Sequence, residues 1–289
     1  MAADSFSYPQ ECHVGGLAGV EFTCIIPAMR MFYTTHEIGY NPTDVLRFMQ
    51  QRNWIPILAI AIYGTSIVLG RKFMVDRKAV ETKIPIALWN FSLSLFSFIG
   101  AFRTIPHLFY AMSVMSLRDI MCTPPAHTFG IGSTGLWVQL FCLSKFPELF
   151  DTFFVVIHKK PLLFLHWYHH ISVLLYCWHA CVNERANGLF FICMNYSVHA
   201  VMYGYYFLSA IKMKPNWLKA SFITKFQISQ MFIGVVVTLL GFKFQSTDNC
   251  HVKTELNIAA FLMYGSYLLL FCLFYAKKYS SKKKVKKLE

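Results

Sequence analysis

The sequence predicts an all-α integral membrane protein, and two features of its composition lead to that prediction. Of the 289 residues, 56% are hydrophobic and 14% are charged, whereas soluble domains average about 45–50% apolar and about 25% charged residues. A soluble domain could not hide so much apolar surface behind so few charges, and the low charge also excludes an intrinsically disordered chain. The formal net charge is +13. In a membrane protein such a basic excess belongs mostly to cytoplasmic loops, so no nucleic-acid partner is expected.

Seven segments are long and apolar enough to be transmembrane helices, each of which needs about 20 residues. The third of them is the weakest, because Lys145, Glu148 and Asp151 lie inside it. We expect one transmembrane domain at 54–276, preceded by an irregular or amphipathic lead-in at 1–53 without a signal-peptide pattern and followed by a lysine-rich tail. The seven segments and the tail cover residues 54–70, 85–102, 135–157, 162–181, 188–211, 222–242, 256–276 and 277–289.

The distribution of Lys and Arg predicts the orientation. The connections after the first, third and fifth segments, together with the tail, contain about twice as many Lys and Arg residues as the remaining connections. The positive-inside rule then places the C-terminus in the cytosol and the N-terminus in a lumen or outside the cell. The chain ends with Lys286 and Lys287 at the fourth and third positions from the C-terminus. This arrangement matches a dilysine retrieval signal for the endoplasmic reticulum; the alternative is a solvated lysine tail that binds anionic lipid.

Polar and ionisable side chains are concentrated inside four consecutive apolar segments. Such groups are costly in a bilayer, so they normally face the protein interior and mark a functional site. His166, His169 and His170 share one face of their helix, because their spacing of three and four residues matches the helical repeat. The polar positions of the other three segments are Lys145, Glu148, Asp151 and Thr152, then Asn195, His199, Met202 and Tyr203, and then Thr224, Gln227 and Gln230. Four polar stripes predict a shared interior chamber.

Three chemistries could use this chamber. A histidine-box metal oxidase would need several histidine boxes for two irons, whereas this chain has one, and no CxxC pair suggests zinc. A single zinc ion at the histidines stays open. Imidazole can also act as a nucleophile or as an acid and base. Proton-coupled transport is the third, and it favours charged pathways that open to both sides of the membrane.

The four motifs in this order resemble the four sequence boxes of the ELO family of very-long-chain fatty acid elongases, and the resemblance covers roughly residues 50–280. It implies an endoplasmic reticulum enzyme with seven transmembrane helices, six of which form a barrel-like ring around a narrow tunnel closed at the lumenal end. The implied reaction is the condensing step of elongation, in which acyl-CoA and malonyl-CoA give 3-oxoacyl-CoA, CoA and carbon dioxide. The strings at 166–170 and 195–203 resemble the branch that acts on saturated and monounsaturated chains.

The resemblance also implies partners and cofactors. A 3-ketoacyl-CoA reductase, a 3-hydroxyacyl-CoA dehydratase and an enoyl-CoA reductase would complete the cycle as separate proteins. We expect no bound metal or cofactor, with acyl-CoA and malonyl-CoA as the substrates, and the oligomeric state stays open. The alternative from another class is a non-catalytic seven-helix lipid transporter or lipid-binding protein on the same scaffold.

Residue roles follow from the same resemblance. It assigns His169 as the nucleophile that holds the acyl group, His199 as the residue that handles a proton or polarises the carbonyl, and Asp151 as the carboxylate that orients an imidazole. A direct condensation with histidine as general base stays open. His166 and His170 complete the expected catalytic set. The expected substrate-binding residues are Lys145, Glu148, Thr152, Lys159, Lys160, Asn195, Tyr203, Lys219, Thr224, Gln227 and Gln230.

A disulfide is expected on the lumenal side. Cys122 and Cys250 lie in two loops between transmembrane segments on the side where disulfides persist, and family members resemble this in linking those loops.

Replacing Lys286 and Lys287 with Ser tests the retrieval signal. We expect part of the protein to escape to later secretory compartments, because the receptor-read lysines are lost. Fluorescence microscopy of the full-length chain with an N-terminal tag measures this. An unchanged reticular distribution would mean that other signals retain the protein.

Overall fold

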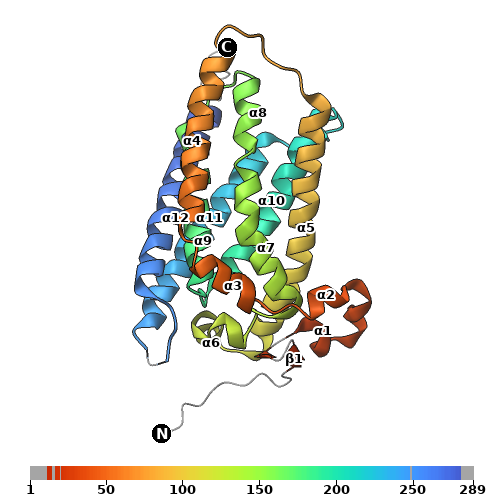
Figure 1. The fold of residues 1–289 in the computed structure, drawn as a ribbon, viewed down its shortest axis with the longest axis vertical. Coiled ribbons are helices and arrows are strands. Elements are labelled where there is room, and N and C mark those ends of the chain that lie inside the picture. Colours follow the sequence, from red (N-terminus) through yellow and green to blue (C-terminus); the bar gives the residue numbers. More distant parts are fainter. Residues whose placement is uncertain (1–11, 15–16, 20, 248, 281–289) are drawn as a thin grey trace.

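A computed structural model describes residues 12–14, 17–19, 21–247 and 249–280 of the chain (Figure 1). The described part is helical apart from one short antiparallel hairpin of β1 (Cys12–Val14) and β2 (Leu17–Gly19), in which Cys12 lies opposite Gly19. The long helices run roughly along the longest axis of the molecule, and the short elements gather at the end where the N-terminus lies (Figure 1). The all-α prediction is therefore confirmed except for the hairpin.

The helices cover the expected segments, but α5 (Lys83–Val114) continues 12 residues past the expected end at 102, and the third expected segment consists of two helices. The long helices are α4 (Trp54–Met74), α5 (Lys83–Val114), α7 (Gly132–Glu148), α8 (Asp151–Ile157), α9 (Phe164–Val182), α10 (Gly188–Ala210), α11 (Ala220–Gln245) and α12 (Thr254–Tyr275). The short elements are α1 (Phe22–Ile25), the 3₁₀ helix η1 (Pro27–Phe32), α2 (Thr35–Ile38), α3 (Thr43–Gln50), α6 (Leu117–Cys122), the 3₁₀ helix η2 (Pro125–His127) and the π-helical turn η3 (Ala276–Ser280).

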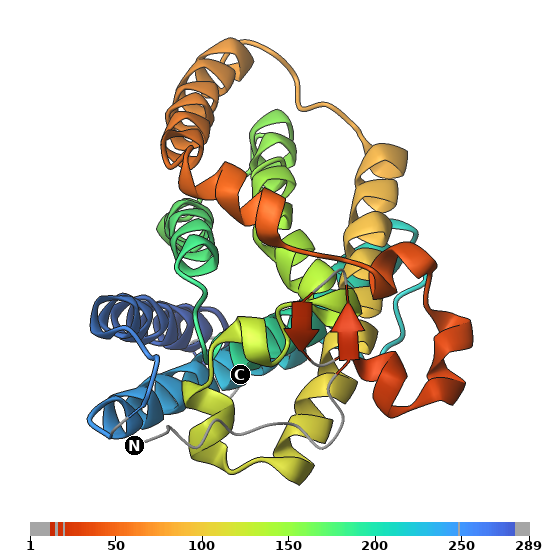
Figure 2. The same cartoon turned by 60° about the horizontal axis from the view of Figure 1, so that its bottom comes forward.

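Two ends of the bundle differ in character. We call the end formed by the loops 75–82, 158–163 and 211–219 the basic end, since these loops contain many of the lysines counted above. The opposite end, formed by residues 21–53, α6 and the loop at 246–253, is the N-terminal end. Figure 2 shows this end coming forward, with α2 and α3 lying across the ends of the long helices.

Four helices in the described part are long and apolar enough to cross a membrane by length and composition: α4, α5, α11 and α12 continued by η3. The prediction of seven spans is thus confirmed for four. The other three regions are helical but differ physically. α7 and α8 are separate helices of 17 and 7 residues, α9 contains four histidines, and α10 contains Asn195 and His199.

The third expected segment is broken after Glu148. Pro147 has no N–H group and cannot take part in a regular helical ladder. The N–H groups of Leu149 and Phe150 instead bond to carbonyls three residues earlier, which is the tighter 3₁₀ pattern. α8 then starts at Asp151. Asp151 therefore begins a new helix, although it lines the same cavity as Glu148.

Small residues let the long helices approach closely. A Cβ added at Gly100 on α5 would lie 2.4 Å from the ring of Tyr196 on α10, and one at Gly234 on α11 would lie 2.3 Å from the ring of Tyr264 on α12. The Tyr196 hydroxyl in turn donates to the carbonyl of Trp137 at 2.8 Å. Close packing of this kind is typical of helices that associate in a membrane.

A buried carboxylate fixes the lead-in to the bundle. Glu37 of α2 accepts hydrogen bonds from the Nε atom of Arg103 on α5 at 2.8 Å and from Trp137 Nε1 on α7 at 2.9 Å. Burial alone would raise the pKa of the Glu37 carboxyl, but hydrogen bonds from Arg103 and the Thr34 backbone lower that pKa from 4.5 to about 2. The described part of the lead-in is thus a docked element and not an irregular segment.

A second buried carboxylate caps α7. Glu21 accepts from the backbone N–H of Ser133 at 2.7 Å, which is one of the N–H groups that lack a partner at a helix start. Gly132 has a φ of +60°, and a Cβ there would lie 1.8 Å from the Glu21 carboxylate. Glycine at position 132 therefore satisfies both the backbone conformation and the close approach.

One covalent bond also ties the N-terminal end. Cys122, the last residue of α6, and Cys250, in the loop between α11 and α12, form a disulfide. The backbone N–H of His251 donates to the Cys122 carbonyl at 3.0 Å beside it. The structure therefore joins the two loops that the sequence reading selected. Cys24 of α1 is disulfide-bonded as well.

Replacing Glu37 with Gln should destabilise the protein by about 3–5 kcal/mol, because the buried Arg103 guanidinium loses its counter-charge. Glu81→Gln is the matched control, since the Glu81–Lys83 pair is 3.4 Å apart with both side chains largely exposed. Thermal unfolding of detergent-purified protein measures both variants.

The same experiment has a pH arm. The folded-state pKa of Glu37 is lowered, so its contribution to stability is complete above the unfolded value of 4.5 and is lost as the pH falls toward about 2. Wild type should lose melting temperature over this interval more steeply than Glu37→Gln. Equal melting temperatures for wild type and Glu37→Gln at pH 7 would contradict the anchoring role.

Candidate active site

A cavity of about 1040 Å³ lies among α5, α8, α9, α10 and α11 and reaches the loops of the basic end. It brings together most of the polar residues that the sequence selected. The expected site residues on its wall are Glu148, Asp151, Lys160, His166, His169, His170, Asn195, His199, Tyr203, Thr224, Gln227 and Gln230. The remaining expected residues, which do not line it, are Lys145, Thr152, Lys159 and Lys219. The shared chamber expected from the four stripes is thus present.

The histidine box of α9 is compact but only partly hydrogen-bonded. The rings of His166 and His170 have centroids 4.6 Å apart, and those of His169 and His170 are 5.8 Å apart. His166 Nε2 lies 2.9 Å from Thr152 Oγ1. The Nδ1 atoms of His169 and His170 are buried and have no hydrogen-bond partner among the described residues. Buried polar atoms without a partner are rare, so these two imidazoles are not simply structural links between helices.

Lys145 and Glu148 form a buried ion pair beside the cavity. Their side chains are 2% and 4% exposed, and Lys145 Nζ lies 2.7 Å from Glu148 Oε1. Lys145 Nζ also donates to Asn195 Oδ1 at 3.2 Å. His199 Nδ1 is 3.9 Å from the same Glu148 oxygen. This cluster therefore connects α7 to α10 and places a carboxylate near the imidazole of His199.

Asp151 contacts other partners than we expected. Its carboxylate accepts from Trp89 Nε1 and from the Tyr203 hydroxyl, each at 2.6 Å. The expectation that Asp151 orients an imidazole is wrong in this structure. The Asp151 carboxylate thus links α8 to α5 and α10. Glu148 is the carboxylate that lies near a histidine.

The other polar residues act mainly as supports. Thr152 is 2% exposed and links His166 to the Tyr63 hydroxyl, which lies 2.7 Å from Thr152 Oγ1. Gln227 Nε2 donates to Met202 Sδ at 3.1 Å. Thr224 donates to a carbonyl of its own helix.

The basic mouth of the cavity differs in part from the expected lysines. Lys160 lines it, together with Lys83 and Lys278. Lys159 instead donates its Nζ to the carbonyls of Val75 and Arg77 at 2.9 and 3.0 Å, and so closes the loop after α4.

Sequence reasoning missed several wall and support residues. Trp89, Asn90 and His158 line the cavity, and Tyr63 supports Thr152. Trp and Tyr read as ordinary apolar residues within a span, so they gave no signal. Asn90 could have been found, because it is a polar residue in the middle of an apolar segment. Within the described residues, no three His, Cys, Asp or Glu side chains form a group that could hold one metal ion.

Comparison with known proteins places this geometry in a family. Residues 48–287 match the ELO family, described as the GNS1/SUR4 family. The chain is 41% identical over 248 residues to very long chain fatty acid elongase 6 of Gallus gallus, covering 85% of this chain and 92% of that relative. It is 40% identical over 247 residues to the Homo sapiens protein of the same name, covering 85% and 92%.

A more distant relative agrees with this result. The chain is 35% identical over 239 residues to very long chain fatty acid elongase 3 of Mus musculus, covering 81% of this chain and 86% of the relative. The resemblance inferred from the four motifs is confirmed, and this chain belongs to the ELO family of very long chain fatty acid elongases.

Proposed function

We propose that this protein catalyses the condensing step of fatty acid elongation, in which acyl-CoA and malonyl-CoA give 3-oxoacyl-CoA, CoA and carbon dioxide. One observation supports this more than any other: His169 lines a large cavity, and its buried Nδ1 atom has no hydrogen-bond partner within the described residues. An imidazole that lines a cavity without a structural hydrogen bond at Nδ1 suits acyl transfer. Membership of an elongase family and elongase-named relatives at about 40% identity support the same reaction.

The proposal includes a membrane arrangement. α4, α5, the pair α7–α8, α9, α10, α11 and α12 would be the seven spans, with six of them around the cavity, in the membrane of the endoplasmic reticulum. The basic end would face the cytosol by the positive-inside rule, and the N-terminal end the lumen. The disulfide between Cys122 and Cys250 supports this direction, because an oxidising compartment preserves such bonds.

Substrate binding follows from charge and polarity. The phosphates of CoA are too polar for the bilayer core, so they would stay at the basic mouth near Lys83, Lys160 and Lys278. The thioester would then extend inward to the histidines. Gln227 lines the same wall, and the second hydrogen of its amide nitrogen can be donated to the thioester region.

The first chemical step would be acyl transfer to His169. A neutral ring nitrogen attacks the thioester carbonyl carbon, the C–S bond breaks, and CoA leaves as a thiolate that takes up a proton. The second step would be decarboxylation of malonyl-CoA, which breaks a C–C bond and leaves its electron pair on the α-carbon. That carbanion attacks the acyl carbonyl, releasing the 3-oxoacyl product and restoring the His169 imidazole.

The buried cluster on α7 and α10 would assist both steps. The Glu148 carboxylate lies 3.9 Å from His199 Nδ1, so its negative charge would favour a proton on this imidazole, and Lys145 and Asn195 fix Glu148 in turn. A protonated or N–H-donating His199 would stabilise a developing oxyanion. No bound metal or cofactor is required by this scheme.

A transporter or lipid-binding protein on the same scaffold is the alternative. Purified protein incubated with acyl-CoA and labelled malonyl-CoA separates the two. Release of labelled carbon dioxide together with a 3-oxo product supports the condensing enzyme. Uptake of lipid without condensation would replace it with the alternative.

The acyl-enzyme is the first testable intermediate. Intact-mass analysis after incubation with acyl-CoA alone should show one acyl adduct on wild type and none on His169→Ala, because the nucleophilic nitrogen is gone. His179→Ala is the matched control. His179 is on the same helix but bonds to Asn183 and does not line the cavity, so this variant should still form the acyl adduct on His169. Chelation with EDTA should leave turnover unchanged.

Two other results would redirect the mechanism. An adduct that persists in His169→Ala and disappears in His199→Ala would exchange the two roles. Wild type that never forms an adduct while still condensing would support direct condensation with histidine as general base. Loss of turnover with EDTA, restored by zinc or iron, would overturn the imidazole mechanism.

The carboxylates give a second prediction. Glu148→Gln should lower kcat by at least about 100-fold, because it removes the charge beside His199. Asp151→Asn should retain more activity, since an amide can still accept one of the two hydrogen bonds from Trp89 and Tyr203. Glu255→Gln, an exposed residue in the first turn of α12, is the control. A larger loss for Asp151→Asn than for Glu148→Gln would reverse this assignment.

A further inference from the structure

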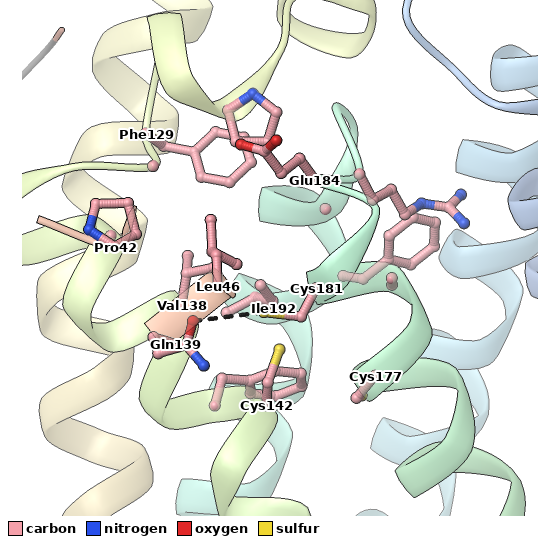
Figure 3. Close-up of a pocket in the computed structure, with 18 of the residues that line it drawn as sticks. Pro42, Leu46, Phe129, Val138, Gln139, Cys142, Cys177, Cys181, Glu184 and Ile192 are labelled. Carbon is pink, nitrogen blue, oxygen red and sulfur yellow. Dashed lines mark hydrogen bonds between the residues drawn. The ribbon is translucent and has the colours of Figure 1, made fainter. Parts of the chain in front are cut away.

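A second cavity, of about 260 Å³, lies between the site and the N-terminal end. Its wall is formed by α7, α9 and α10 and by residues of the lead-in, among them Pro42, Thr43 and Leu46. Figure 3 shows Leu46 beside Val138, with Phe129 and Glu184 toward one side of the cavity and Cys142 and Cys177 toward the other. No step of the proposed reaction uses this space.

The two cavities share a wall residue, because Asn195 lines both of them. On α9, His169 faces the first cavity, whereas Val173 and Cys177 face the second. These positions are four residues apart, so they lie on one helix face. Cys181, also on the wall, is 12 residues after His169, or about 18 Å along the helix. A chain attached at His169 and following α9 therefore leads into the second cavity.

The lining fits hydrocarbon. Most lining residues are apolar or thiol side chains; the polar ones are Thr43, Gln139, Tyr176, Glu184, Arg185, Asn195 and Tyr264. The Arg185 guanidinium is engaged elsewhere: it donates to Asn187 Oδ1 at 2.5 Å, to Tyr176, and to the carbonyl of Leu256 at 2.9 Å. Glu184 lies at the exposed rim. Charged groups thus do not occupy the interior of the cavity.

Helix α3 of the lead-in forms one wall of the second cavity, and hydrogen bonds hold this helix in place. Met49 of α3 is 1% exposed, and its Sδ atom accepts a hydrogen bond from Gln139 Nε2 at 2.9 Å. Gln50 donates to the Val182 carbonyl at 3.2 Å. Trp178 Nε1 on α9 donates to Asn53 at 3.0 Å just after α3. These bonds hold α3 against the end of α9, so the Leu46 side chain has a defined position.

We propose that α3 forms the end wall of the acyl-chain chamber, and that Leu46 limits the length of acyl chain the protein accepts. This inference rests on the proposed function. The family match begins at residue 48, so Pro42, Thr43 and Leu46 of this wall lie before the matched region.

The test changes the volume at Leu46 in the full-length protein. kcat/KM is measured with labelled malonyl-CoA and a series of saturated acyl-CoAs of increasing even chain length. Leu46→Ala should shift the preference toward longer chains by at least one two-carbon unit, and Leu46→Trp should shift it toward shorter ones. Relative kcat/KM for neighbouring lengths should change by at least about 10-fold, because a single methylene in an apolar pocket is discriminated by about that factor.

The control is Phe48→Ala. Phe48 is on the same helix two residues later, is 47% exposed and does not line the cavity, so its removal should leave the length preference unchanged. Leu46→Phe serves as a milder enlargement if Leu46→Trp gives no cooperative melting transition.

The outcomes are distinguishable. An unchanged length profile in Leu46→Ala and in the folded enlarged variant, with condensation intact, overturns the inference and leaves the proposed function standing. An equal shift in Phe48→Ala would also overturn it, because the effect would not come from the cavity wall. Wild type that releases no labelled carbon dioxide with any chain length refutes the proposed function and this inference with it.

Discussion

The buried ion pair between Lys145 and Glu148 is the constraint on which the site depends. Each of these groups would be strongly unfavourable alone in a low-dielectric interior, so neither can be moved without the other. Their pairing fixes the end of α7, and the further contacts to Asn195 and His199 fix the register of α7 against α10. The free imidazoles of α9 then face a wall whose charges are already compensated. A site built in this way can remain polar inside an apolar bundle.

The sequence predicted the parts of this protein that depend on local patterns. Apolar segment length located every long helix to within a few residues at most boundaries, since burial in lipid leaves few other conformations for such segments. Helical spacing likewise predicted that His166, His169 and His170 share a face. Near Pro147 the segment divides into two helices, and the rule did not predict that Asp151 would bond to Trp89 on α5 and Tyr203 on α10. Spacing predicts which residues share a helix face but not which side chains of other helices they contact.

Contacts between distant segments could not be read from the sequence. Nothing in the apolar run of α5 indicated that Trp89 would bond to Asp151 or that Arg103 would meet Glu37. The lead-in was the least predictable part, because its short helices lack the length that identifies a span. Its role became visible only through side-chain contacts with α5, α7 and α9. The cavity next to Leu46 is a product of the same long-range packing.

The cap that Glu21 supplies to α7 has a consequence for assembly. Ser133 receives its partner from a residue 112 positions earlier in the chain, so the start of α7 cannot be completed by its own neighbourhood. Glu37 makes its bonds to Arg103 and Trp137 across 66 and 100 positions. Both acidic side chains remain solvated until α5 and α7 have been synthesised and packed. The lead-in therefore docks late, and it can dock only when α5 and α7 are correctly packed.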